Sequence, residues 1–182
     1  MEHLYYLVAQ LPAISVNDAS SQKLPLTVGY FKDLCSRFMS EKSAKLAEKL
    51  TLEPPVEPVS TGSVFLDEWY EKERCLRLAL AQIRALKMKK DVKDLPSASD
   101  GESIQAARTA TGMDSPLAAE QYLNQYRLGI LDRIAPMDNF SADAVYSYGL
   151  KLMLAERMKK FNKDEGLASY HKIYDEILGE KK

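Results

Sequence analysis

The chain has 182 residues, of which 46% are hydrophobic, and its 25 basic and 26 acidic side chains give a net charge of −1. This balance argues against a nucleic-acid-binding protein, which would carry a basic excess, and the length suits one sizeable core. No apolar run reaches the roughly 20 residues that a membrane-spanning helix needs, and no secretory signal peptide is recognisable, so we expect a cytoplasmic protein.

The first 52 residues predict an N-terminal helical segment. Residues 4–9, LYYLVA, form an apolar run that is short enough to be either a helix or a strand. Loop-forming residues continue to Pro25, and Thr27 is placed to cap a helix. Another helix is expected over 41–52. Three prolines then end it and predict an extended linker over residues 53–62.

The strongest helical pattern lies between Phe65 and Lys93. Apolar residues recur there at helical spacing without proline or glycine, which predicts a long helix that begins after Ser63 and crosses the domain. Trp69 lies on the main apolar stripe and is the expected core anchor. Acidic residues near the start and lysines near the end complement the helix dipole.

The remaining residues predict a polar loop and three further helices. The loop covers 94–115, with one or two helical turns between Ile104 and Thr109. Helices are predicted from Ser115 to Ala135, over 142–161 after a cap at Ser141, and from a cap at Asn162 onward. We therefore expect an all-α bundle of five or six helices around the long one, with residues 63–182 as its main part.

Seven charged residues lie within or beside the apolar stripes of three predicted helices. Because a buried charge without a partner is costly, we expect these residues to pair across helix interfaces and to fix the register of the helices. The alternative is a mixed acidic and basic site for a small anion. The residues are Glu73, Arg77, Arg84, Glu120, Arg127, Glu156 and Arg157.

A second group of charges, Lys87, Lys89 and Lys90, follows Arg84 near the end of the long helix. These lysines form either a solvated helix end or a docking patch for an acidic partner or anionic lipid.

Catalytic and metal-binding motifs are absent from the sequence. The two histidines, His3 and His171, have no histidine or cysteine three or four positions away, as a helical zinc site would require. Glycine-rich phosphate loops and the GxSxG elbow are also missing. We therefore expect neither enzymatic activity nor a cofactor.

Four stretches taken together resemble an uncharacterised bacterial family that is encoded with V-type ATPase operons and is similar to a shortened form of the V-type ATPase C subunit, also called the d subunit. They are LYYLVAQLP, EWYEKERCLRLALAQIRALKMKKD, DSPLAAEQYLNQYRLGILD and YGLKLMLAERMKKFNKDEGLASYHKIYDEI. The resemblance implies a non-catalytic helical subunit that links the proteolipid rotor ring to the soluble central shaft. Such a subunit would be peripheral to the inner membrane through these partners. The alternative function is a helical protein-binding module or an assembly factor of another complex.

Overall fold

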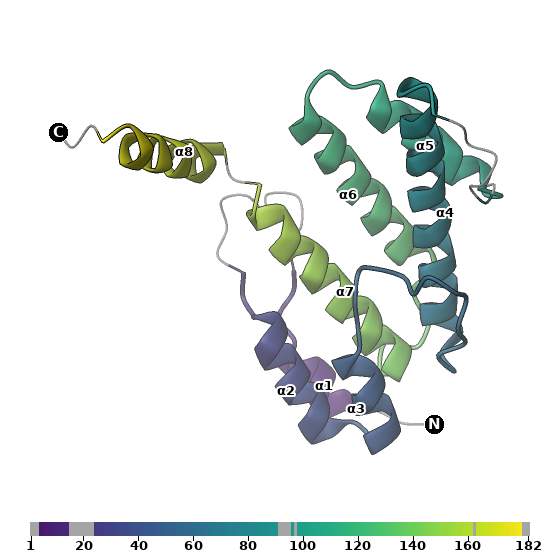
Figure 1. Cartoon of the computed structure of the whole chain (residues 1–182). Coiled ribbons are helices and arrows are strands. Elements are labelled where there is room, and N and C mark those ends of the chain that lie inside the picture. Colours follow the sequence, from purple (N-terminus) through teal and green to yellow (C-terminus); the bar gives the residue numbers. More distant parts are fainter. Residues whose placement is uncertain (1–3, 15–23, 91–95, 97, 162, 180–182) are drawn as a thin grey trace.

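The computed structural model describes residues 4–14, 24–90, 96, 98–161 and 163–179. Within these ranges the chain forms eight α-helices and no strand, which confirms the predicted all-α fold class (Figure 1). No helix among them is both long enough and apolar enough to cross a membrane. The helices are α1 (Tyr5–Gln10), α2 (Val28–Phe38), α3 (Glu41–Glu48), α4 (Val64–Lys87), α5 (Gly101–Thr111), α6 (Pro116–Arg133), α7 (Ala142–Lys159) and α8 (Lys163–Leu178).

Most of these helices begin where the sequence supplies a capping side chain. Six of the described helices have an N-cap side chain that accepts a hydrogen bond from a backbone N–H of the first turn: Thr27, Ser40, Ser63, Asp100, Ser115 and Ser141. Such a bond satisfies an N–H group that has no partner within its helix. The predicted starts of α2, α4, α6 and α7 are confirmed. The cap predicted at Asn162 lies outside the described residues.

The larger apolar cluster, here called the N-terminal core, joins α1, α2, α3 and α7 to the first turns of α4 and the end of α6. Trp69, the expected core anchor, is fully buried in it together with Phe31 and Leu150. The helix predicted over 41–52 ends at Glu48, and Leu50 beyond it is buried in the same core. The proline-rich segment 53–62 therefore connects two parts of one core.

The smaller cluster, here called the distal core, lies between α5, the second half of α4 and the first half of α6. The polar loop predicted over 94–115 contains a longer helix than expected: α5 covers Gly101–Thr111 and includes the one or two helical turns predicted between Ile104 and Thr109. The sequence signal of α5 is weak, since its buried residues are one serine and the three alanines Ala106, Ala107 and Ala110. These small side chains let α5 approach α4 closely, and Lys72 and Asp100 form a salt bridge of 3.1 Å between them.

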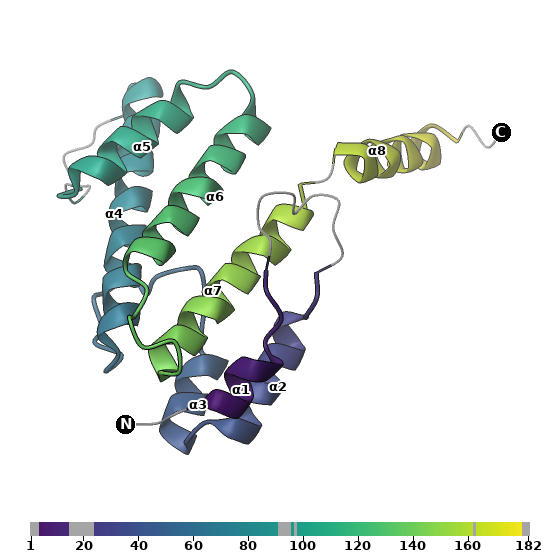
Figure 2. The same ribbon diagram turned by 180° about the vertical axis from the view of Figure 1, so that it is seen from behind.

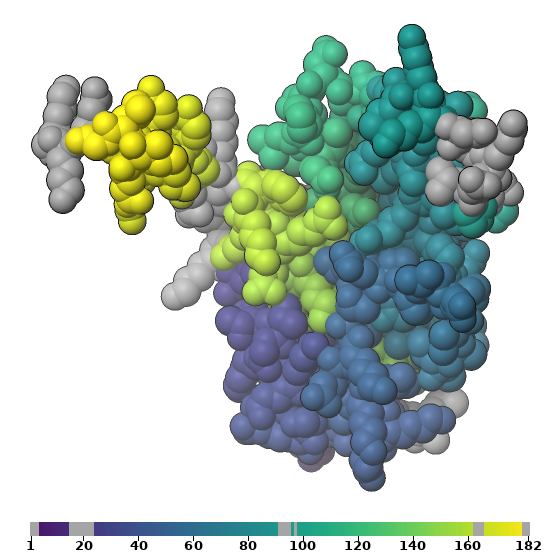
Figure 3. Space-filling model, viewed as in Figure 1, coloured from purple at the N-terminus to yellow at the C-terminus, as the bar shows by residue number. Residues whose placement is uncertain are grey.

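The connection over residues 134–141 joins α6 to α7, and α4 passes alongside α6 (Figures 1 and 2). The helix α8 continues the chain after α7 but stands apart from the bundle as a separate lobe (Figure 3).

Candidate functional site

The interior ion pair between Glu73 and Arg127 joins α4 to α6. The Nε and Nη2 groups of Arg127 donate hydrogen bonds of 2.9 and 3.0 Å to the two carboxylate oxygens of Glu73. Only 1% of Glu73 and 4% of Arg127 is exposed. Two parallel bonds between a guanidinium and a carboxylate are the strongest geometry for such a pair. Along α4, Glu73 lies between Tyr70 of the N-terminal core and Leu76 of the distal core, so the pair forms a polar layer between them.

Two further side chains complete this polar layer. The Nε group of Arg77 donates a 2.8 Å hydrogen bond to Glu73, and its Nη2 group donates to the carbonyl oxygen of Leu52 at 3.4 Å. On the other side, Arg127 donates to the Oδ1 atom of Asn124 at 3.4 Å. Glu73 therefore accepts bonds from two arginines, one on its own helix and one on α6, as the predicted pairing across helices requires.

A second ion pair connects α6 to α7. The Nη2 group of Arg157 on α7 donates a 3.0 Å hydrogen bond to Glu120 on α6, and about a third of each side chain is exposed. The two pairs together tie α6 to α4 and to α7. Five of the seven charges singled out in the sequence are thus paired: Glu73, Arg77, Arg127, Glu120 and Arg157.

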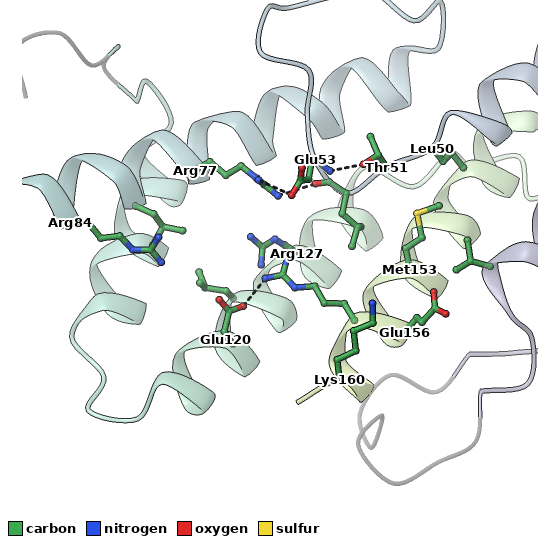
Figure 4. Close-up of a pocket in the computed structure, with 15 residues that line it drawn as sticks. Leu50, Thr51, Glu53, Arg77, Arg84, Glu120, Arg127, Met153, Glu156 and Lys160 are labelled. Carbon is green, nitrogen blue, oxygen red and sulfur yellow. Dashed lines mark hydrogen bonds and ion pairs between the residues drawn. The ribbon is translucent and has the colours of Figure 1, made fainter. Parts of the chain in front are cut away.

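A pocket with a volume of about 610 Å³ lies between α4, α6 and α7 (Figure 4). We call it the basic pocket, because five basic and three acidic side chains line it. Six of the seven predicted charges are among its lining residues, and Glu73 is buried behind them. The basic lining residues are Arg77, Arg84, Arg127, Arg157 and Lys160; the acidic ones are Glu53, Glu120 and Glu156.

Three of these charged side chains are not part of the pairs. Arg84 on α4 and Glu156 on α7 are exposed, as is Lys160 at the end of α7. Within the described part of the chain, none of the three has a salt bridge. The prediction that Arg84 and Glu156 belong to the ion-pair network is therefore wrong, because both line the basic pocket without a described salt bridge.

Sequence reasoning missed two charged residues of the basic pocket. Lys160 follows Glu156 and Arg157 by four and three positions, so helical spacing places it on their face and could have identified it. Glu53 lies in the connection after α3, near Arg77 at 3.7 Å, where no periodic pattern exists to indicate its position.

The predicted docking lysines lie at the opposite end of α4 from Ser63. Lys87, Lys89 and Lys90 are all exposed, and Lys87 donates a hydrogen bond to the carbonyl oxygen of Thr111 at the end of α5. That bond ties one of the three lysines to the distal core. Their role in docking a partner stays a prediction.

The C-terminal helix α8 carries the apolar face predicted for it, and that face is exposed. Its members have between 48% and 77% of their surface in solvent: Leu167, Tyr170, Ile173, Tyr174 and Ile177. The rings of Tyr170 and Tyr174 stack with centroids 5.9 Å apart, one turn from each other. An amphipathic helix whose apolar side has no cover is a typical element of a protein interface.

The described residues show no set of three or more histidine, cysteine, aspartate or glutamate side chains that could hold a metal ion. The buried thiol of Cys35 is poorly suited to nucleophilic chemistry, because burial raises its pKa to about 12.

In comparisons with known proteins, no family model, curated protein or solved structure matches the chain.

Proposed function

We propose that this chain is a non-catalytic subunit or accessory protein of a V-type ATPase or ATP synthase, and that it links the membrane rotor ring to the central shaft. The proposal starts from the sequence resemblance to the C subunit of V-type ATPases. The four resembling stretches, 4–12, 68–91, 114–132 and 148–177, coincide largely with α1, α4, α6, α7 and α8. They contribute Trp69, Glu73 and Arg127 to the interior. On this proposal the protein is held at the cytoplasmic face of the inner membrane by its partners.

The observation that best supports this function is the buried connection between α4 and α6. A protein that transmits force must resist sliding and bending of its helices. The helix α4 contributes to both cores, and the pair of Glu73 with Arg127 fixes it against α6 between them. A shift of one helix along the other by one turn would separate two buried charges, which typically costs about 3–5 kcal/mol.

The surface of α8 supports a role in binding another protein. Its five exposed apolar residues would be covered by a partner, which is what an adaptor needs at each of its contacts. The same surface also supports the alternative function, a helical binding module or assembly factor of another complex. The identity of the bound proteins decides between the two functions.

Co-purification from native membranes tests the proposal. The full chain is tagged, produced in a cell that contains a V-type ATPase, crosslinked mildly and captured, and its partners are identified by mass spectrometry. We expect to recover shaft and proteolipid subunits.

The variant Ile173→Glu/Ile177→Glu should no longer capture these subunits. The control Val56→Glu/Val59→Glu adds the same charge at exposed apolar positions outside α8 and should still capture them. Recovery of proteins from another complex supports the alternative, and a capture that yields no part of the ATPase contradicts the first proposal.

A further inference from the structure

The basic pocket has a small excess of positive charge, because its five basic lining residues outnumber its three acidic ones and the buried Glu73 by one. Arg127 and Arg77 both bind Glu73, and Arg157 binds Glu120. Arg84, Lys160 and Glu156 remain, and in the described residues none of the three has a salt bridge. A recess with walls of low polarity strengthens the field of such charges and concentrates anions near them.

The cations approach the basic pocket from different helices. Figure 4 shows the head groups of Arg84 and Arg77 reaching in from α4, that of Arg127 from α6 and that of Lys160 from α7. A guanidinium has five N–H donors, and the bond from Arg157 to Glu120 is made by its Nη2 group. Donors on three helices are therefore available to an oxyanion, which is the group that arginine and lysine recognise best.

Apolar side chains line part of the basic pocket as well. Leu50 and Met153 lie across the pocket from Arg84 in Figure 4, and Val28 and Leu52 are also among its lining residues. The volume of about 610 Å³ lies within the range of about 300–1,000 Å³ that is typical of small-molecule sites. A bare inorganic anion would leave this apolar part in contact with water.

From these features we infer that the basic pocket binds a small organic anion with a doubly charged oxyanion head, such as a phosphate, and an apolar body. The head lies near Arg157, with Arg84 on one side of it and Lys160 on the other, and the body lies against Leu50 and Met153. Glu156, which lines the same pocket without a salt bridge, repels an anion bound there and so lowers its affinity. This inference goes beyond the adaptor function and does not depend on it.

Titration of the full chain with 1-naphthyl phosphate at low salt, followed by calorimetry, tests the inference. We expect saturable binding with a dissociation constant at or below about 1 mM. Inorganic phosphate should bind at least about ten-fold more weakly, because it leaves the apolar part unfilled. Absence of saturable naphthyl phosphate binding, or equal affinity for the two anions, overturns the inference.

Matched variants locate the site. Arg84→Gln/Lys160→Gln removes two exposed cations that have no described salt bridge, and it should weaken naphthyl phosphate binding at least about ten-fold. The control, Lys42→Gln/Arg108→Gln, removes two exposed cations outside the pocket and should change the affinity less than about two-fold. Equal weakening by both doubles overturns the inference, since it would indicate attraction by net charge alone.

The variant Glu156→Gln gives a test in the opposite direction. Removal of the repelling carboxylate should tighten binding by about two-fold to five-fold, an effect that a damaged fold could not produce. Unchanged or weaker binding by Glu156→Gln, with helical circular dichroism equal to that of the wild type, overturns the assignment of the head group to this end of α7.

Discussion

Glu73 and Arg127 lie 54 positions apart in the chain, yet they face each other in the interior through two hydrogen bonds of 2.9 and 3.0 Å. They lie between the N-terminal core and the distal core. Apolar contacts tolerate small shifts between helices, whereas a two-bond ion pair is satisfied in one register. The pair therefore sets how α4 and α6 are aligned.

Removal of either partner of this pair should destabilise the protein strongly. Arg127→Met leaves the Glu73 carboxylate buried with Arg77 as its remaining partner, and we expect a loss of about 3–5 kcal/mol in the free energy of unfolding. Urea denaturation followed by far-ultraviolet circular dichroism measures it. The double variant Glu73→Leu/Arg127→Met buries no charge and should recover a large part of the loss. A double variant less stable than Arg127→Met would contradict the expected coupling.

Substitution of Arg77 should have a smaller effect than substitution of Arg127. In Arg77→Leu, Glu73 keeps its two bonds to Arg127, and Arg77 is about a third exposed. Solvent screens a contact at such a position, so we expect a loss of about 0.5–1.5 kcal/mol. Thermal and urea unfolding of the variant beside the wild type measure the difference. An unchanged free energy of unfolding would remove Arg77 from the ion-pair network.

The close approach of α2 and α7 at Gly149 can be tested with a pair of alanine variants. A Cβ atom at Gly149 would lie 2.6 Å from the ring of Phe31 and 3.0 Å from a methyl group of Leu50. Gly149→Ala should therefore destabilise the protein by about 1–3 kcal/mol. At Gly129, on the exposed side of α6, a Cβ meets no atom within 4 Å. Gly129→Ala should stabilise the helix by about 0.5–1 kcal/mol. Equal effects of the two variants would contradict the described contact.

The stability of the distal core should depend on pH through Asp100. Burial alone would raise the pKa of Asp100, but hydrogen bonds from Ser103 and Lys72 outweigh it and lower the pKa below its ordinary value. The ionised carboxylate therefore stabilises the folded state above the unfolded pKa of about 4, and this contribution is lost as the pH falls through the lower folded pKa.

The comparison variant for this pH dependence is Asp100→Asn, which keeps a capping side chain and removes the titrating group. Between about pH 5 and pH 2, the wild type should lose more of its free energy of unfolding than the variant does. Urea titrations at several pH values measure both slopes. Parallel slopes would show that Asp100 does not contribute to the acid sensitivity.

The sequence predicts helices well where a cap and an apolar stripe coincide, and poorly where packing uses small residues. Ser63, Ser115 and Ser141 mark the starts of three long helices because a hydroxyl beside a helical pattern is a local signal. The helix α5 was not predictable in the same way. Its buried alanines add little hydrophobicity, and its position is set by contacts with α4 and α6.

The charged residues were identifiable from the sequence, but their partners were not. Glu120 and Arg127 border one stripe of α6, yet Glu120 binds Arg157 and Arg127 binds Glu73. Arg84 and Glu156 stay outside both pairs and line the basic pocket. Helical periodicity indicates on which face of its helix a residue lies, whereas the distance between two helices depends on the whole fold.

The two cores differ in how soon during synthesis all of their residues are available to pack. Residues of the distal core all lie between Leu76 and Leu123, so their contacts are available early to the emerging chain. The N-terminal core instead requires α7: Tyr146 donates a hydrogen bond to the carbonyl oxygen of Ser43, 103 positions earlier, and Tyr148 donates one to that of Pro12, 136 positions earlier. Helices α1 to α3 therefore leave the ribosome well before α7, which covers them, and their part of the core is completed only after α7 is made.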